Sequence, residues 1–285
     1  MVIQHNLFSM NASRMYNINV NDRARISEKM SSGYRIHRAA DDAAGLAISE
    51  KMRRQIKGLT QAVANAQDGV SLIQSAEGAL QEVHEMLQRL NELCVQGANE
   101  TLTEQDREYI QAEVESLQSE INRTGASTTF NEIHILGGAN PGQGSSSNPQ
   151  PLELTLQVGS ESDEDNTMTL KIGVVNCDVL GISGVNVRGA DGQSARNGID
   201  AVKGAIEINS RERANLGSYQ NRLEHTIKNL ENVVENTTAA ESNLRDAEMA
   251  QTISDYKNKD IIVQAGQMIL AQANQSKQSV LQLLQ

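Results

Sequence analysis

The sequence predicts a mainly α-helical protein, with long antiparallel helices forming a terminal coiled coil and a helical bundle, and a small β-hairpin region in the middle. All three prolines of the 285-residue chain lie between Pro141 and Pro151, so both flanks lack the residue that breaks helices. With no tryptophan, two phenylalanines and five tyrosines, the interior must be aliphatic, which suits narrow contacts between helices. Apolar residues also recur at helical spacing in two distant segments.

The first of these segments predicts one long amphipathic helix. Its apolar and small residues alternate steps of three and four, with one skip. A helix of about forty residues spans roughly 60 Å, which is longer than a compact domain of this size requires. The stripe consists of Leu59, Val63, Ala66, Val70, Ile73, Ala76, Leu80, Val83, Leu87, Leu90 and Cys94.

The middle of the chain changes character. The helical pattern ends at residues 124–125, and residues 137–150 form a stretch rich in Gly, Ser, Asn and Pro that predicts a loop. Residues 152–158 and 168–174 alternate apolar and polar side chains and predict a hairpin. The acidic connection 159–166 is its expected solvated tip, with a calcium site as the less favoured alternative.

The second apolar segment predicts a helix that returns along the first. Two stripes far apart in sequence favour antiparallel helices packed as a bundle. We also expect Gly78, Gln220 and Thr237 to leave the helix contacts imperfect and so to lower the barrier to sliding between alternative packings. The returning stripe is Leu216, Leu223, Ile227, Leu230, Val234 and Leu244, interrupted by Gln220, Thr237 and Glu241.

Charge is distributed unevenly along the chain. The net charge of −11 and the lack of a concentrated basic surface argue against a nucleic-acid partner. Residues 1–21 carry a single formal charge, Arg14, and residues 261–285 carry only Lys277. Ends that are poor in charge but rich in aliphatic and amide side chains cannot fold alone, yet can be buried against copies of each other. The sequence therefore predicts a self-assembling subunit.

Targeting and redox signals are sparse. No apolar run approaches the length of a membrane span, and the amino terminus lacks the pattern of a cleaved secretory signal. These features predict a cytosolic protein, unless export uses a signal that is read without being cleaved. Cys94 and Cys177 form neither a disulfide framework nor a metal-ligand spacing, so we expect two free thiols.

Candidate catalytic motifs are incomplete. His84-Glu85 begins like a zinc-protease helix, but Gln88 stands where the second histidine is required. The glycines of residues 137–144 lack the Lys-Ser/Thr ending of a phosphate-binding loop. Asp41 and Asp42 are adjacent and would point about 100° apart on a helix, which favours capping or an intersubunit contact over acid–base work. We expect no enzyme activity, metal or cofactor.

Signatures at both ends of the chain resemble those of bacterial flagellins, in the same order and spacing. The resemblance covers nearly the whole chain outside the middle. The amino-terminal motifs are Met30–Ile36, Ala39–Ile48, Ile56–Gln61, Asp68-Gly69, Glu77–Leu80, Leu87–Arg89, Glu92-Leu93, Phe130-Asn131 and Leu136. The carboxy-terminal motifs are Ala240–Ser242, Arg245–Ala250, Leu270–Asn274 and Ser279–Leu284.

The resemblance implies a subunit of the flagellar filament, a helical tube that acts as a propeller for motility. Residues 1–43 and 245–285 would form a coiled coil lining the filament channel. Residues 44–175 and 190–244 would form the inner bundle with its hairpin, and residues 176–189 would be a vestigial variable region. A hook–filament junction protein is the alternative with the same architecture. A more distant alternative is a flagellin scaffold that carries an enzyme domain between its helical ends. The short segment between those ends leaves no room for such a domain.

The resemblance also implies site residues and partners. In many flagellins an exposed helix is recognised by Toll-like receptor 5. The matching residues here are Gln88, Arg89, Leu93, Gln96 and Glu113. Without the resemblance, an exposed Arg and Glu would be ordinary solvated charges, and Asn91, Leu117 and Ala64 depart from the receptor-binding pattern. Assembly contacts are expected from Leu7, Ile18, Ile36, Asp41, Asp42, Ile253, Ile261, Leu270, Val280 and Leu284.

Further partners follow from the same resemblance. They are other copies of the chain, bound through both termini, an export apparatus that reads the amino terminus without cleaving it, an export chaperone on the carboxy terminus, a filament cap and hook-junction proteins. The expected location is then the extracellular flagellar filament, with no cofactor, no nucleic acid and no membrane insertion.

Overall fold

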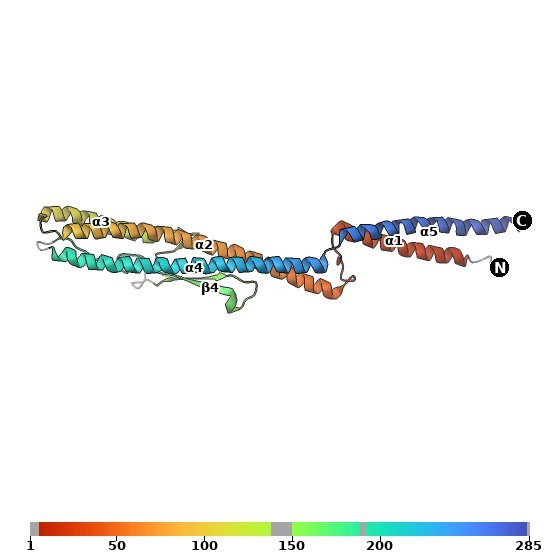
Figure 1. Cartoon of the computed structure of the whole chain (residues 1–285), viewed down its shortest axis with the longest axis horizontal. Coiled ribbons are helices and arrows are strands. Elements are labelled where there is room, and N and C mark those ends of the chain that lie inside the picture. The colour runs from red at the N-terminus through yellow and green to blue at the C-terminus, as the bar shows by residue number, and fades with distance from the viewer. Residues whose placement is uncertain (1–5, 138–149, 189–191, 284–285) are drawn as a thin grey trace. The chain divides into compact units, whose positions relative to one another are not determined.

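The computed structural model describes residues 6–137, 150–188 and 192–283, with side chains described as far as Ser276. Helices dominate the described residues, and the strands form two small hairpins between α3 and α4 (Figure 1). The mainly α-helical prediction is confirmed. The chain divides into two compact units, Met1–Ile56 with Glu235–Gln285 and Lys57–Val234. The helices are α1 Leu7–Ser32, α2 Ala43–Gly97, α3 Glu104–Ser127, α4 Gln193–Arg245 and α5 Met249–Leu283.

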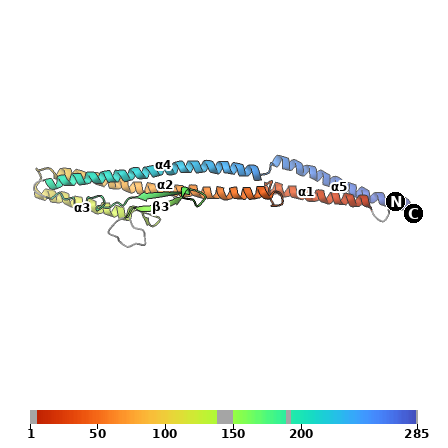
Figure 2. The same ribbon diagram turned by 90° about the horizontal axis from the view of Figure 1, so that it is seen from below.

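The predicted apolar stripe of α2 forms the centre of the larger unit. Leu80, Val83, Leu87 and Leu90 are all 1 % exposed or less, as the steps of three and four require. Both α3 and α4 run alongside α2 (Figures 1 and 2), and the Arg89–Glu113 ion pair and the hydrogen bond from Asn209 to the Leu80 carbonyl join them to it. The helix therefore buries one side against each neighbour, which is why its stripe is wide.

The helical pattern breaks once more than the sequence predicted, between α2 and α3. Thr103 caps α3 because its hydroxyl accepts a hydrogen bond from the Asp106 amide, while the Asp106 carboxylate accepts one from the Thr103 amide at 3.0 Å. From there α3 turns back along α2. Ile110, Val114 and Ile121 are buried in the same core as α2.

Two hairpins follow α3. The predicted one is confirmed: β3 Leu152–Gln157 pairs antiparallel with β4 Thr167–Ile172, with Leu152 opposite Ile172. Alternate residues of β4 are buried, as in a strand with one face on a core. A shorter hairpin, β1 Thr129–Phe130 with β2 Ile133–His134, was not predicted.

The connection between β3 and β4 contains a 3₁₀ helix, Glu164–Asn166, and the acidic side chains of the connection are all exposed. Within the described residues no group of three or more His, Cys, Asp or Glu side chains could hold a metal ion. The tip is thus exposed to solvent. The Gly-rich residues 138–149 before the hairpin lie outside the described residues.

The returning helix α4 buries Leu216, Leu223 and Leu230 as predicted. One polar residue joins them: Asn209 is 1 % exposed and donates a hydrogen bond to the Leu80 carbonyl of α2 at 3.1 Å. The expectation for Gly78 was wrong, because this residue is exposed and a side chain there would meet no atom within 4 Å. Gly78 therefore lies outside the contact between α2 and α4.

The smaller unit pairs α1 with α5 in antiparallel fashion. Polar contacts join the two helices, such as Arg23 to Asp260 at 2.8 Å and the amide of Gln267 to the Tyr16 hydroxyl at 2.9 Å. No residue of α1 is buried, and the described buried apolar side chains of α5 are Val263 and Ala273. None of the helices, as far as they are described, is long and apolar enough to cross a membrane.

Candidate functional site

The expected assembly residues on α1 and α5 are mostly at the surface. Leu7, Ile18, Ile253 and Ile261 are between 44 % and 69 % exposed, and Leu270 is half-buried. An isolated apolar residue at a protein surface is ordinary. A helix pair that exposes most of its large aliphatic side chains is unusual and indicates an interaction surface. The side chains of Val280 and Leu284 lie outside the described residues.

The remaining expected assembly residues lie in the connection between α1 and α2, and each has an internal role. Ile36 is 3 % exposed. Asp41 accepts hydrogen bonds from the amides of His37 and Arg38, and these bonds hold the pKa of its carboxyl below the ordinary value. Asp42 caps α2 by accepting a hydrogen bond from the Gly45 amide at 2.9 Å. The two carboxylates therefore order the connection, in line with the capping role that the sequence favoured.

The two signature segments meet each other at a terminal junction, which we define as residues 33–36 and 245–247. The Arg35 amide donates to the Arg245 carbonyl at 2.7 Å, and the Ala247 amide donates to the Gly33 carbonyl at 2.9 Å. Gly33 adopts a φ of 75°, which ends α1 in the left-handed conformation that glycine favours. The junction ties the end of α1 to the start of α5.

Arg245 makes the side-chain contacts of this junction, which sequence reasoning missed. Its guanidinium lies 4.6 Å from the centre of the Tyr34 ring and 2.7 Å from the Glu50 carboxylate. Hydrogen bonding to Arg245 lowers the pKa of Glu50. Both residues that flank the guanidinium belong to the amino-terminal part of the chain. The only available signal was that Tyr34 and Arg245 each fall in a signature motif, and nothing in one sequence says that the motifs touch.

The residues matched to a receptor surface divide into exposed and buried ones. Arg89 of α2 donates to Glu113 of α3 at 2.9 Å and to Glu92 at 3.0 Å, and the bond to Glu113 raises the pKa of the guanidinium. Gln88 and Gln96 are exposed on α2. Leu93 is 1 % exposed and belongs to the core. The structure thus brings Arg89 and Glu113 together on the surface and places Leu93 in the core.

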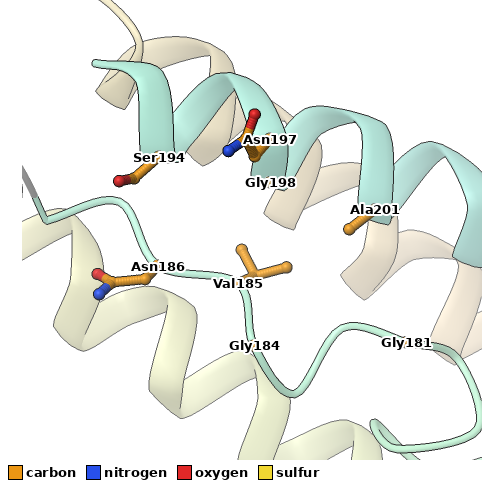
Figure 3. Close-up of a pocket in the computed structure, with 8 residues that line it drawn as sticks. All are labelled: Gly181, Gly184, Val185, Asn186, Ser194, Asn197, Gly198 and Ala201. Atoms are coloured by element: carbon orange, nitrogen blue, oxygen red, sulfur yellow. The ribbon is translucent and has the colours of Figure 1, made fainter. Parts of the chain in front are cut away.

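A cavity of about 320 Å³ lies between the start of α4 and the segment 181–186 (Figure 3). Val185 projects into the space between the two, while Ser194 and Asn197 lie along the helix. The lining residues supply amide and hydroxyl groups, and none carries a formal charge, so they offer no acid–base pair. They are Gly181, Gly184, Val185, Asn186, Ser194, Asn197, Gly198 and Ala201.

The two cysteines are free, as predicted, and both are buried. Burial raises the pKa of both thiols to about 11, so neither forms the reactive thiolate at neutral pH. His84, the incomplete zinc motif, lies 2.9 Å from the amide nitrogen of Gln88 through its Nε2. An amide nitrogen is not a zinc ligand, and the pair instead forms a hydrogen bond across one helical turn.

Comparison with known proteins identifies the family. The profile of the bacterial flagellin N-terminal helical region matches residues 3–141, and that of the bacterial flagellin C-terminal helical region matches residues 199–284. The chain belongs to the bacterial flagellin family. A flagellin of Halalkalibacterium halodurans is 47 % identical over 284 residues, and the flagellar filament 33 kDa core protein of Treponema phagedenis is 42 % identical over 289. Each alignment covers all of both chains.

The solved structures contain a similar fold. The structure of a putative flagellar hook-associated protein from Vibrio parahaemolyticus has a TM-score of 0.58 and covers 72 % of this flagellin and 100 % of its own chain. Its sequence identity is 15 %, so the likeness concerns the fold alone.

As a flagellin, the protein is a structural subunit of the extracellular flagellar filament and not an enzyme. The full-length match to relatives of similar size makes it a short form of the family. Function therefore depends on surfaces rather than on a reactive centre. The exposed faces of α1 and α5 and the α2–α3 surface are the candidate sites.

Proposed function

We propose that this flagellin polymerises through the exposed apolar faces of α1 and α5, which line the filament channel. Residues 1–43 and 245–285 form that inner layer, residues 44–175 and 190–244 form the next one, and residues 176–189 remain from a variable region. The observation that carries the proposal is the absence of buried residues on α1. A helix gains most of its stability from burying an apolar face. Within the part of the chain that the structure describes, α1 pairs with α5 yet most of its large apolar side chains stay exposed.

The energetics support contacts between copies. Burying one large aliphatic side chain contributes about 1.5–3 kcal/mol. Leu7, Ile18 and Ile261 alone are 69 %, 46 % and 64 % exposed, so covering them in a polymer would favour association by several kcal/mol. Charge repulsion would oppose this little, because residues 1–21 and 261–285 carry one formal charge each.

Substitution of Leu7, Ile18 and Ile261 by Asp tests the proposal. We expect the critical concentration for filament growth to rise at least about a thousandfold, since three apolar contacts are lost and three carboxylates would be buried. Sedimentation of seeded filaments measures it. The matched control is Leu7→Met, Ile18→Leu and Ile261→Leu, which keeps the faces apolar and should polymerise normally. Filament growth of the Asp variant at the wild-type concentration would refute the proposal.

The same seeded assay separates a filament subunit from a hook–filament junction protein. A junction protein adds few copies to an end and stops, whereas a filament subunit elongates in proportion to the supply of protein. For this filament subunit we propose, as partners, an export apparatus at the amino terminus, an export chaperone at the carboxy terminus, and a filament cap and hook-junction proteins. Family membership supports these partners.

Recognition by Toll-like receptor 5 is a second candidate function, which we propose for the α2–α3 surface. The supporting observation is that Arg89 and Glu113 come from different helices yet lie 2.9 Å apart and half-exposed, so both could be contacted at once. Gln88 and Gln96 flank them on the exposed side of α2. Leu93 would contribute indirectly, by packing α2 against α3.

Changing Arg89 and Glu113 to Ala should reduce receptor signalling by about tenfold or more, because a charged hydrogen-bonding group at an interface is typically worth over 1 kcal/mol. A reporter-cell assay with depolymerised protein measures the effect. Glu153 and Lys171 form an exposed ion pair on the hairpin and provide the control pair for Ala substitution. Equal signalling by both double variants would argue against a receptor role for this surface.

A further inference from the structure

The most exposed methionines among the described residues lie on α1 and α5. Met10 and Met15 of α1 are 63 % and 48 % exposed, and Met268 of α5 is 69 % exposed. In the larger unit, by contrast, Met168 is 5 % exposed and Met86 is half-buried. A dissolved oxidant reaches a thioether sulfur in proportion to its exposure, so the methionines of α1 and α5 are the accessible targets for oxidation.

Both exposed methionines of α1 belong to its exposed apolar face. Met10 is three residues from Leu7, and Met15 is three residues from Ile18. Residues three apart are neighbours on the surface of a helix, so each thioether lies beside an aliphatic side chain that the proposed polymer covers. The two sulfur atoms are therefore part of the surface through which α1 would contact another copy.

Met268 takes the corresponding place on α5. It is seven residues from Ile261, almost two full turns, so the two side chains project from the same side of the helix. Met249 is also exposed, at 42 %, but its twelve-residue separation from Ile261 places it about a third of a turn away around the helix axis. Met249 is thus an exposed methionine outside the apolar face.

The two thiols of the chain compete poorly for an oxidant. Cys94 and Cys177 are both buried, and burial raises the pKa of each thiol to about 11. At neutral pH this suppresses the thiolate form, which is the form that oxidants attack. A two-electron oxidant that meets the free subunit should therefore react first at the exposed thioethers.

We propose that Met10, Met15 and Met268 form a reversible oxidation site that controls whether a free subunit can join the filament. The inference rests on the proposed function, because the site lies in the faces that polymerisation would bury. A hydroperoxide transfers one oxygen atom to the thioether sulfur: its O–O bond breaks, an S–O bond forms, and water or an alcohol leaves with the proton. The sulfur loses two electrons, and the hydroperoxide gains them.

The reverse step needs a thiol-dependent methionine sulfoxide reductase. Two thiols become a disulfide, the sulfoxide oxygen leaves as water, and the thioether is restored. The cycle matters for assembly because a sulfoxide is polar, and burying its oxygen against aliphatic side chains without a hydrogen-bond donor is unfavourable. In the filament a neighbouring copy would cover the same sulfur atoms, so oxidation acts on the subunit before it adds.

Peroxide treatment of depolymerised protein tests the proposal. Peptide mass spectrometry should find added oxygen at Met10, Met15 and Met268 at least about tenfold faster than at Met168. The critical concentration, measured by sedimentation of seeded filaments, should rise at least about a hundredfold, since three polar groups would be buried. Incubation with methionine sulfoxide reductases and a dithiol should return it to within about threefold of the untreated value.

Two leucine variants locate the effect. Met10→Leu with Met15→Leu and Met268→Leu keeps the faces apolar but removes their sulfur, so its critical concentration before and after peroxide should differ by less than about threefold. The matched control, Met249→Leu with Met86→Leu, removes one exposed and one half-buried methionine outside the faces. It should keep the full response to peroxide.

A peroxide response that persists in the triple variant, or one that is lost in the control, overturns the proposal. So does wild-type protein that carries the three sulfoxides yet polymerises at its untreated concentration. If the triple variant forms no filaments even before treatment, recovery of the oxidised wild type by the reductases decides instead. Untreated wild-type filaments establish polymerisation itself, so this failure is distinct from failure of the contacts of α1 and α5.

Discussion

Removal of residues 1–43 and 245–285 is expected to abolish filament formation completely, at any concentration at which the intact chain polymerises. Most of the large apolar side chains that the structure exposes lie in these two segments, on α1 and α5. Each contributes about 1.5–3 kcal/mol when fully buried. Losing all of them removes far more free energy than any charged contact of the larger unit could restore, since exposed ion pairs contribute about 0.2–1 kcal/mol each.

Electron microscopy and sedimentation of the trimmed protein measure this outcome. The trimmed chain retains the core of the Lys57–Val234 unit, so its cooperative thermal unfolding by circular dichroism is the control for folding. A folded, trimmed chain that stays monomeric agrees with the proposal. Filaments that persist after trimming would place the main subunit contacts outside α1 and α5.

Gly125→Ala is expected to cost about 1–3 kcal/mol in the free energy of unfolding, the usual range for overpacking a buried site. Gly125 is buried near the end of α3, and an added Cβ would overlap the Val175 carbonyl oxygen. That oxygen belongs to backbone that cannot move freely, because the Val175 amide donates a hydrogen bond to the Leu136 carbonyl at 3.0 Å. The helix and the chain after β4 would have to separate.

Gly78→Ala is the matched control, because Gly78 is also helical but meets no atom within 4 Å. Here the same substitution should stabilise by about 0.5–1 kcal/mol, through the lower backbone entropy of the unfolded chain. Urea unfolding followed by circular dichroism measures both. Stabilisation of the Gly125 variant as well would mean that the α3 contact with Val175 is looser than described.

The long helices were predictable because their signal is repeated many times. If a single position such as Val83 or Leu223 were polar, the remaining residues of its stripe would still show the helical period. The β3–β4 hairpin was predictable for the same reason, since six residues alternate on each strand. The β1–β2 hairpin was not, because two-residue strands contain no period. Its turn residues Asn131 and Glu132 have φ of 48° and 67°, and only the asparagine is typical of such a turn.

The candidate sites show the same division. Exposed apolar positions on the ends followed from composition and charge, and Leu7, Ile18, Ile253 and Ile261 are exposed as a polymerising surface requires. The burial of Leu93 could not be inferred from the pattern of α2 alone. Its burial depends on α3 packing over it, which in turn depends on the break that Thr103 and Asp106 create. Gly78 was predicted to lie at the contact between the helices but is exposed. A small residue near an apolar stripe does not indicate on which side of the helix it lies.

By itself the sequence determined the helices, the long hairpin, the family and the surplus of apolar residues at both ends. These are properties of local periodicity and composition, which a single chain records directly. Only the tertiary structure decided that Gly33 and Ala247 share a hydrogen bond, that Arg245 lies on the Tyr34 ring, and that Arg89 of α2 pairs with Glu113 of α3. Such contacts join residues far apart in the chain, and their free energy depends on distances and directions that no local pattern contains.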